Sequence, residues 1–322
     1  MYGVKISGVG RAVPELELSN HDIAEFIETS DEWIESRTGI KSRHISSGET
    51  TTDLAVIAAK NALEDGGIDA SQIDLVIVAT VTPDSAMPST ACMVAKRIGI
   101  KGATCFDISA ACSGFIFASE IAVSFIKQGN YQNALIIGAE VLSRAVDWED
   151  RGTCVLFADG AGAAIYKRCS ENKIVNILTV SDGEGSDYIT LPTLSRPNRF
   201  NQTEMSGEYM KMNGREVYRF ATTAVPQNIQ DVLKDTGYTP ADIDLFILHQ
   251  ANSRIMDSVA KKLDVDKEKF FKNLQDYGNT SAASIPMALV DAKPYLKSGD
   301  KIILSGFGAG LTWGSMFIIW GQ

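Results

Sequence analysis

A helix-like stretch and the strand that follows it, Leu63-Glu64-Asp65-Gly66-Gly67-Ile68 and Ile73-Asp74-Leu75-Val76-Ile77, occur a second time in this chain. Shifted by 170 positions, the copy reads Leu233-Lys234-Asp235-Thr236-Gly237-Tyr238 and Ile243-Asp244-Leu245-Phe246-Ile247. Each copy reaches glycine at the end of a helix, crosses a short acidic linker and enters a strand rich in β-branched residues. That order is typical of a helix that feeds a mostly parallel sheet.

The repeat predicts an α/β protein of two similar halves, in which mostly parallel mixed sheets are layered with helices. We expect an N-terminal half at residues 1–172 and a C-terminal half at residues 173–322, because residues 168–173 are polar and turn-like. Residues 182–214 are rich in Gly, Ser, Asn and Pro, so they are predicted to form a loop excursion outside the core.

Composition limits the classes of function. The chain has 322 residues, 45% of them hydrophobic, and a net charge of -10, which argues against binding nucleic acid. It shows neither a basic N-terminal region followed by an apolar one nor an apolar run of about 18 to 20 residues, so we expect a cytoplasmic protein that does not enter a membrane. The five cysteines are odd in number and lack zinc-site spacing, which predicts reduced thiols and no metal.

Cys112 lies in Asp107-Ile108-Ser109-Ala110-Ala111-Cys112-Ser113-Gly114-Phe115, where an apolar strand passes into an amphipathic helix. At a helix N-terminus the dipole favours the thiolate, so the sequence predicts a lowered thiol pKa. The small neighbours leave room for a substrate carbonyl and for backbone N–H groups that form an oxyanion hole. The alternative is a small core residue, since free cysteines are often buried.

Two further polar residues follow strand-like or turn-like segments in the second half. His249 ends the apolar run 246–248, and Asn279 follows a glycine turn before a helix of small residues. A single histidine on an apolar strand is more often a satisfied core residue. Three such residues together are hard to explain as packing, so we predict a thiol-acyl site where the two halves meet, with the loop 308–310 contributing a backbone N–H.

With these residues in place, the chain resembles the thiolase-fold condensing enzymes, and specifically the β-ketoacyl-acyl carrier protein synthase III family, over nearly its whole length. The resembling segments are 107–115, 249–252, 278–281 and 306–314, with 29–34 and 37–40 similar to the coenzyme A entrance. Elongating ketosynthases use two histidines in the second half, where this chain has only His249. Thiolases use a second cysteine near the C-terminus, and none follows Cys169 here.

The resemblance implies the initiating condensation of type II fatty acid biosynthesis. Cys112 would take the acyl group of an acyl-CoA, with the backbone N–H groups of Cys112 and Ala309 as oxyanion hole. Malonyl-acyl carrier protein would then lose carbon dioxide and attack that acyl group, while His249 and Asn279 donate hydrogen bonds. The resemblance also implies a homodimer without a permanently bound cofactor, since acyl-CoA is a substrate.

Other site residues are implied by the same resemblance. Coenzyme A binding falls to Trp33, Arg37, Arg151 and Asn252. The acyl pocket falls to Phe307 and to Met87, which stands where some relatives place an aromatic residue that reaches across the dimer. Docking of the acidic carrier protein falls to the cations Arg219, Arg254, Lys261 and Lys262, of which the last three would otherwise be read as a solvated helix face.

Three alternatives remain open at this point. A specialised relative of secondary metabolism would use the same triad with another acceptor. A papain-like cysteine hydrolase also uses Cys, His and Asn in that order, although the repeat and the missing Cys-Trp signature disfavour it. A non-catalytic acyl-CoA binding scaffold would tolerate loss of the triad, which is intact here. Primer length is left undecided.

Overall fold

The computed structural model describes residues 2–193, 199 and 208–321. Part of the predicted excursion at 182–214 therefore lies outside the described residues. The remainder of that stretch carries two short paired strands, β9 (Ile189–Thr190) and β10 (Lys211–Met212). Among the described residues, no helix is both long enough and apolar enough to cross a membrane.

The first sheet is built from the N-terminal part of the chain. Its five strands run in the order β1-β7-β6-β4-β5. Their bounds are β1 (Gly3–Ala12), β4 (Leu75–Ala79), β5 (Thr104–Ile108), β6 (Asn133–Val141) and β7 (Asp159–Cys169). Strands β4 and β6 are buried along their whole length, so their continuous apolar runs match a sheet that is covered on both faces.

The second sheet is built from the C-terminal part, in the order β11-β12-β13-β8. Its strands are β8 (Ile174–Ser181), β11 (Leu245–Leu248), β12 (Lys301–Gly308) and β13 (Thr312–Ile319). β7 ends at Cys169 and β8 begins at Ile174, so the strands of the two sheets come from either side of this junction. The division into repeated halves at 172/173 stays a prediction.

Both sheets are mixed, as expected, but parallel pairing is not the majority. β4 pairs in parallel with β5 and β6, and β11 with β12, whereas β1–β7, β6–β7, β12–β13 and β13–β8 are antiparallel. The physical reason is visible at β12 and β13. Only residues 309–311 connect them, and a connection that short permits a hairpin but not a parallel crossover.

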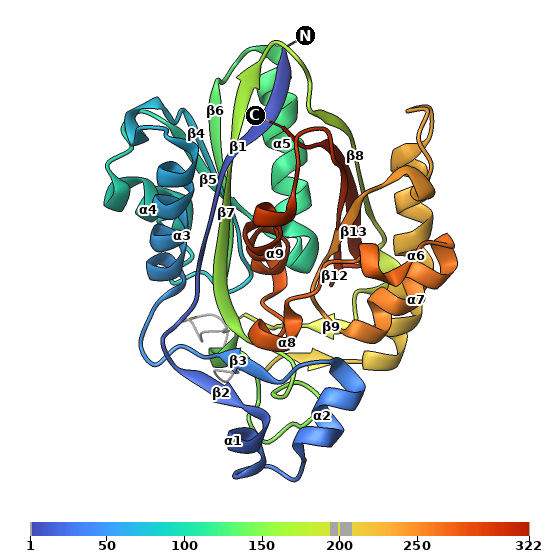
Figure 1. The fold of residues 1–322 in the computed structure, drawn as a ribbon. Helices are drawn as coiled ribbons and strands as arrows, with labels where there is room; N and C mark the ends of the chain where they lie inside the picture. The colour runs from blue at the N-terminus through green and yellow to red at the C-terminus, as the bar shows by residue number, and fades with distance from the viewer. Residues whose placement is uncertain (1, 194–198, 200–207, 322) are drawn as a thin grey trace.

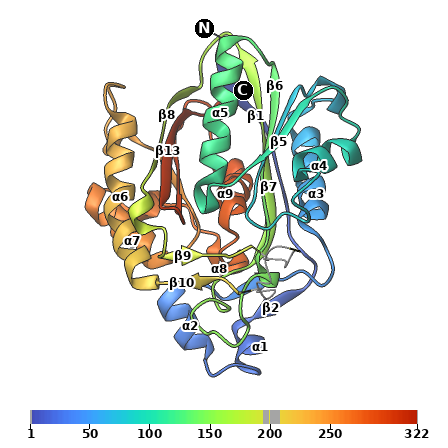
Figure 2. The ribbon, with the colours of Figure 1, turned by 180° about the vertical axis from the view of Figure 1, so that it is seen from behind.

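Helices lie between the sheets and outside them, which gives five layers (Figures 1 and 2). The central helices are α5 (Gly114–Gln128) and α9 (Ser284–Ala292). The first sheet is covered on its outer face by α3 (Thr51–Gly66) and α4 (Thr90–Ile98), the second by α6 (Gly214–Leu233) and α7 (Ser253–Leu263). The smaller elements near the site are α1 (Asn20–Ala24), α2 (Asp31–Thr38), α8 (Leu274–Tyr277), β2 (Glu17–Ser19) and β3 (Ser42–His44).

Each layer position follows from local sequence. α5 and α9 are apolar on most sides because sheets cover them both ways, and Phe115, Ile116 and Leu289 are fully buried. The outer helix α3 begins at a capping box, in which Thr50 and Asp53 satisfy each other's backbone N–H groups. It buries one alanine-rich face on the first sheet, including Ala55 and Ala59.

Glycine lets the site-bearing turns approach the sheets. A Cβ built on Gly138 of β6 would lie 2.1 Å from the carbonyl oxygen of Ala282, in the turn just before α9. A Cβ on Gly306 of β12 would lie 2.9 Å from the Cα of Ser113, just before α5. The starts of both central helices are thereby held against the strands at the junction of the two sheets.

Candidate active site

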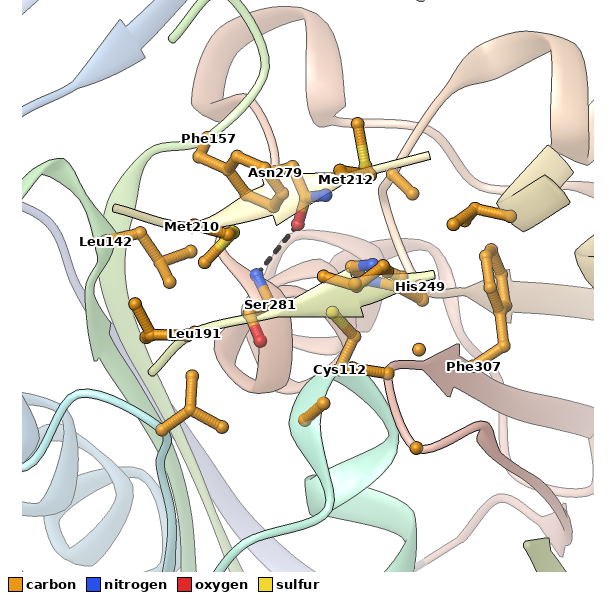
Figure 3. Close-up of a pocket in the computed structure, with 18 of the residues that line it drawn as sticks. Cys112, Leu142, Phe157, Leu191, Met210, Met212, His249, Asn279, Ser281 and Phe307 are labelled. Carbon is orange, nitrogen blue, oxygen red and sulfur yellow. Dashed lines mark hydrogen bonds between the residues drawn. The ribbon is translucent and has the colours of Figure 1, made fainter. Parts of the chain in front are cut away.

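One cavity of about 620 Å³ is lined by residues from both the N-terminal and the C-terminal part of the chain, and it brings the three predicted residues together. Cys112 lies just before α5, His249 follows β11, and Asn279 lies before α9 (Figure 3). All three side chains line this cavity and are almost completely buried. The fold therefore brings to one cavity three residues that lie up to 167 positions apart in the sequence, from Cys112 to Asn279.

Cys112 sits in a short 3₁₀ turn, Ala111–Ser113, between the end of β5 and the start of α5. Ala111 takes a left-handed conformation with φ of 44°, which bends the chain sharply before the nucleophile. The hydroxyl of Ser113 donates to the hydroxyl of Thr312 at 2.7 Å, and the hydroxyl of Thr312 donates to Ala110 O at 3.1 Å. These bonds tie the turn to the C-terminal loop.

The ionisation of Cys112 differs from the sequence prediction. Burial raises the pKa of the Cys112 thiol to about 12, and the negative charge of Glu140 acts in the same direction. A hydrogen bond with the Ser281 side chain lowers the pKa, but by less. The prediction of a lowered thiol pKa is wrong, because removal of the thiol from water raises its pKa.

His249 follows β11 and is held on two sides. Its backbone N–H donates to Ser305 O at 2.8 Å, and its Nδ1 lies 2.7 Å from the hydroxyl of Ser284. The ring of Phe307 meets the imidazole edge to face, with centroids 5.1 Å apart. Burial lowers the pKa of His249 to about 3, so the imidazole is neutral at physiological pH.

Asn279 is oriented by its own turn. Its backbone N–H donates to Leu156 O and its carbonyl accepts from the Ala158 N–H, both at 2.9 Å. The side-chain Oδ1 accepts from the Ser281 N–H at 2.9 Å, the bond drawn in Figure 3. Since that bond uses the oxygen, the amide NH₂ of Asn279 is left to donate on the other side of the group.

Ser281 and Ser284 were not identified as site residues from sequence. Ser281 lines the cavity in a left-handed conformation with φ of 49°, hydrogen-bonds Cys112 and orients Asn279. Ser284 contacts His249. Their position shortly after Asn279 in the sequence could have identified them. A turn that presents one side chain to a site brings the residues that follow it to the same place.

The C-terminal loop closes on the nucleophile. A Cβ built on Gly308 would lie 2.9 Å from the Cys112 N, 3.0 Å from its Cβ and 3.2 Å from its Sγ. Ala309, the predicted second oxyanion donor, follows β12 directly and lines the cavity. The loop backbone therefore lies against the Cys112 peptide, an arrangement that suits two convergent N–H donors.

Three of the predicted coenzyme A residues form one stack. The guanidinium carbons of Arg37 and Arg151 each lie 4.6 Å from the centre of a Trp33 ring. Arg151 also donates to Glu28 O at 2.9 Å. The fourth residue, Asn252, lines the cavity, caps α7 and donates to Arg37 O at 3.0 Å, so it links this stack to the cavity.

The two predicted acyl-pocket residues lie in different places. Phe307 lines the cavity, whereas Met87 lies in the loop before α4, is 84% exposed and is not among the residues that line the cavity of its own chain. Its predicted role across a dimer stays a prediction. The apolar wall instead comes from residues that the sequence reasoning missed, namely Leu142, Phe157, Leu191 and Met210 (Figure 3).

The four predicted docking cations are all exposed, on α6 and α7. Arg219 faces Glu216 at 3.5 Å. Arg254 donates to Ser36 O at 2.9 Å and Lys262 donates to Thr222 O at 2.7 Å, so both are partly engaged. The fourth cation of this set is Lys261, which is exposed on α7. Across the part of the chain that the structure describes, no group of three His, Cys, Asp or Glu side chains is arranged to hold a metal ion.

Two family models match the chain. The one described as 3-Oxoacyl-[acyl-carrier-protein (ACP)] synthase III matches residues 106–183, and the one described as its C terminal matches residues 233–320. Together they span the nucleophile segment, the histidine segment and the asparagine segment.

Whole-chain relatives agree with these matches. A curated beta-ketoacyl-[acyl-carrier-protein] synthase III of Clostridium acetobutylicum is 50% identical over 323 residues, covering 99% of each chain. The crystal structure of 3-oxoacyl-[acyl-carrier-protein] synthase III from Aquifex aeolicus is 44% identical, with a TM-score of 0.91 over 99% of this chain and 100% of that one. The priming beta-ketosynthase of the R1128 polyketide pathway is 32% identical, with a TM-score of 0.92 over 99% and 97%.

Proposed function

The chain belongs to the β-ketoacyl-[acyl-carrier-protein] synthase III family, and we propose that Cys112, His249 and Asn279 perform its reaction as one nucleophile and two hydrogen-bond donors. It is a condensing acyltransferase with the thiolase-like fold, and it catalyses the initiating condensation of type II fatty acid synthesis. The observation that carries the residue assignment is the convergence of the three side chains on one cavity.

The first stage is acyl transfer. The Cys112 sulfur attacks the thioester carbon of an acyl-CoA, and the oxygen of the tetrahedral intermediate takes the negative charge. The N–H groups of Cys112 and Ala309 stabilise that charge, a contribution of about 3 to 4 kcal/mol for a single donor in comparable sites. The bond to the coenzyme A sulfur then breaks. The proton lost by Cys112 ends on that sulfur, so the products are an acyl-enzyme and free coenzyme A.

The second stage is decarboxylative condensation. Malonyl-acyl carrier protein loses carbon dioxide, and the electron pair of the broken C–C bond moves toward the thioester oxygen. His249 Nε2 and the Asn279 amide donate to that oxygen. The new carbon nucleophile attacks the acyl carbon on Cys112, the C–S bond breaks, and Cys112 leaves as a thiolate that regains a proton. The product is a 3-oxoacyl-acyl carrier protein.

The structure supports a donating histidine for a specific reason. The Ser284 hydroxyl lies 2.7 Å from His249 Nδ1 and 3.4 Å from the Gln250 N–H. When its oxygen accepts from that N–H, its own proton is directed to Nδ1, and a neutral imidazole must then carry hydrogen on Nε2. The lowered pKa of His249 keeps it in this neutral form, which suits hydrogen-bond donation to a developing oxyanion.

The substrates approach along the wall that carries the predicted coenzyme A residues. Arg151 now occupies one face of Trp33. Adenine therefore displaces Arg151 or stacks outside it, while Asn252 connects the stack to the tunnel that pantetheine follows. The exposed cations of α6 and α7 dock the acidic carrier protein, and they chiefly speed encounter and set its register.

The protein acts as a homodimer in this proposal. β5 is the edge strand of the first sheet, and each of its residues keeps some exposure in the isolated chain. An unprotected edge of this kind is suited to pairing with a second copy. Met87, exposed in the loop before α4, then floors the pocket of the other subunit.

Intact-protein mass spectrometry tests the proposed residue roles. Acetyl-CoA is added to the wild type and to Cys112→Ser, followed by malonyl-acyl carrier protein. An acetyl adduct on the wild type alone, lost as acetoacetyl carrier protein forms, is the expected result. Longer and branched acyl-CoA donors are run in parallel to define the primer. If no donor leaves an adduct on the wild type, Cys112 is not the nucleophile.

A second candidate function is initiation of a specialised pathway, favoured by the similarity to the priming ketosynthase of a polyketide pathway. The acylation stage is then unchanged, and the acceptor differs. The acyl-enzyme is therefore mixed with the malonyl-acyl carrier protein of fatty acid synthesis, and separately with other malonyl carrier proteins and with hydroxyl and amine acceptors. Discharge by one of the other acceptors, and not by the carrier protein of fatty acid synthesis, supports this candidate over the first.

A further inference from the structure

Glu140 is a fully buried carboxyl group that the mechanism above does not use. It lies near the end of β6, beside the point where the neighbouring parallel strand β4 ends at Ala79. From there its side chain reaches the segment 80–82 that follows β4. Burial of an ionisable group at this depth is costly unless its hydrogen-bonding capacity is filled.

The segment 80–82 fills that capacity. The carboxylate accepts from the Val81 N–H at 3.1 Å and from the Thr82 N–H at 3.1 Å. It also accepts from the hydroxyls of Thr82 at 2.5 Å and Thr80 at 3.2 Å. The Thr82 hydroxyl in turn accepts from the Val141 N–H at 3.0 Å, which closes the network back onto β6. Four donors on three consecutive residues thus converge on one carboxylate.

The charge of Glu140 has no direct cationic partner. Within residues 2–193, 199 and 208–321, no lysine or arginine forms an ion pair with it. The Arg144 guanidinium binds the carbonyls of Thr82 and Pro83 on the other side of the segment. Burial raises the pKa of Glu140 to about 7, against the opposing effect of its hydrogen bonds.

The segment that Glu140 holds is a wall of the active-site cavity. Thr80, Val81 and Pro83 line the cavity together with the residues 109–112. The Thr80 N–H also donates to Ile108 O at 3.2 Å, so the segment is bonded to the last residue of β5, the strand that precedes the Cys112 turn. Through these contacts the Glu140 carboxylate holds in place the cavity wall beside Cys112.

We propose that Glu140 is a positioning residue for acylation, which fixes the 80–82 wall beside Cys112 and uses its charge to restrain ionisation of Cys112 in the free enzyme. The inference rests on the proposed nucleophilic role of Cys112. Its two parts are separable, because geometry depends on the length of the side chain and restraint depends on its charge. The second part agrees with the direction in which Glu140 shifts the Cys112 pKa.

The charge is tested by alkylation with iodoacetamide, which needs neither acyl-CoA nor carrier protein. Modification of Cys112 is followed by peptide mass spectrometry from pH 6 to pH 10 in the wild type and Glu140→Gln. We expect Glu140→Gln to react roughly threefold to tenfold faster at pH 8.5, equivalent to a fall of up to one unit in thiol pKa. Near pH 6, where the wild-type carboxyl is protonated, the two proteins should react alike.

Glu120→Gln is the matched control, because it removes a half-buried carboxylate of α5 that hydrogen-bonds Thr179. Its alkylation profile should match that of the wild type. Glu140→Asp keeps the charge on a shorter side chain, so its alkylation profile should stay near that of the wild type while acetyl transfer from acetyl-CoA slows about tenfold. A wild-type profile for Glu140→Gln, or an equal shift in Glu120→Gln, overturns the charge part.

The positioning part has a readout in the unmodified protein. Hydrogen exchange should show the backbone N–H groups of Val81 and Thr82 as protected, although both follow the end of a strand. Rapid exchange at both, or unimpaired acetyl transfer in Glu140→Asp, overturns this part even if Glu140→Gln does not fold. Failure of the wild type to form any acyl adduct is a different result, because it contradicts the proposed function and leaves the alkylation comparison intact.

Discussion

Substitution of Gly308 by alanine tests how closely the C-terminal loop must approach the nucleophile. The new Cβ would lie 2.9 Å from the Cys112 N and 3.2 Å from its Sγ. Ordinary contacts of a Cβ begin near 3.4 Å. The loop and the Cys112 peptide must therefore separate by about half an ångström, and the nearest atom is backbone, which cannot rotate away as a side chain can.

The magnitude follows from two effects of that separation. Overpacking of a well-packed interior lowers the free energy of unfolding by about 1 to 3 kcal/mol. Misplacement by 1 Å costs catalysis on the order of 10²-fold, so half that distance predicts about a tenfold loss. The loss should fall on acetyl transfer from acetyl-CoA, because Ala309 N–H and Cys112 N–H no longer converge on one oxygen.

The assay is the pre-steady-state rate of acetyl-adduct formation, measured with the thermal midpoint of unfolding. Gly183→Ala is the control, since a Cβ at Gly183 meets no atom within 4 Å and its φ is not left-handed. Iodoacetamide reactivity of Cys112 is measured beside it, because alkylation does not use the oxyanion donors. If Gly308→Ala is acylated within twofold of the wild-type rate and melts at the same temperature, the proposed closeness of loop and nucleophile is wrong.

Four further outcomes follow from the site. The rate at which iodoacetamide alkylates Cys112 should keep rising above pH 9 without a plateau near neutrality, because burial raises the thiol pKa to about 12; a plateau near pH 7 contradicts the buried neutral thiol. Burial lowers the pKa of His249 from 6.5 in the unfolded chain to about 3 in the folded protein, so the neutral imidazole favours folding fully above pH 6.5 and this contribution is lost as the pH drops toward 3. Between pH 7 and pH 4, urea titrations should therefore show that the free energy of unfolding falls by about 3 kcal/mol more in the wild type than in His249→Gln. Ser284→Ala should slow discharge of the acyl-enzyme by malonyl-acyl carrier protein about tenfold while acylation changes little, and equal slowing of both stages argues against control of the His249 tautomer. Trp33→Ala should raise the KM for acetyl-CoA about tenfold with little change in kcat, as expected for a loss of stacking, and an unchanged KM removes the Trp33 and Arg151 stack from the binding site.

The α/β class and the layering of sheets with helices were predictable because they depend on local patterns that the chain repeats. The matched runs at 73–77 and 243–247 become β4 and β11, each a buried strand preceded by a helix. The pairing of strands that lie far apart in the sequence was harder to predict. No local pattern in β1 indicates that it lies antiparallel to β7, a pairing that joins residues as distant as Gly3 and Cys169.

The convergence of Cys112, His249 and Asn279 on one cavity could be predicted because each follows an apolar segment or a glycine turn, and such positions meet at the edge of a sheet. Leu191 and Met210 could not be predicted, because they come from the stretch that reads as a polar excursion. The error in the Cys112 pKa has the same origin. The dipole of α5 is local and visible in the sequence, whereas the walls that exclude water from the thiol come from distant segments.

The two buried ionisable groups together determine when charge appears in the site. Because burial raises the pKa of the Cys112 thiol to about 12 and lowers the pKa of the His249 imidazole to about 3, the two groups do not form an ion pair in the free enzyme. In the proposed mechanism, the N-terminus of α5, the Cys112 and Ala309 N–H groups and the Asn279 amide nevertheless all present positive partial charge to the reacting thioester. These groups stabilise mainly the negative charge that develops on a bound thioester, because the free enzyme holds no thiolate for them to stabilise. Burial that makes Cys112 unreactive alone therefore makes the donors selective for the transition state over the free enzyme.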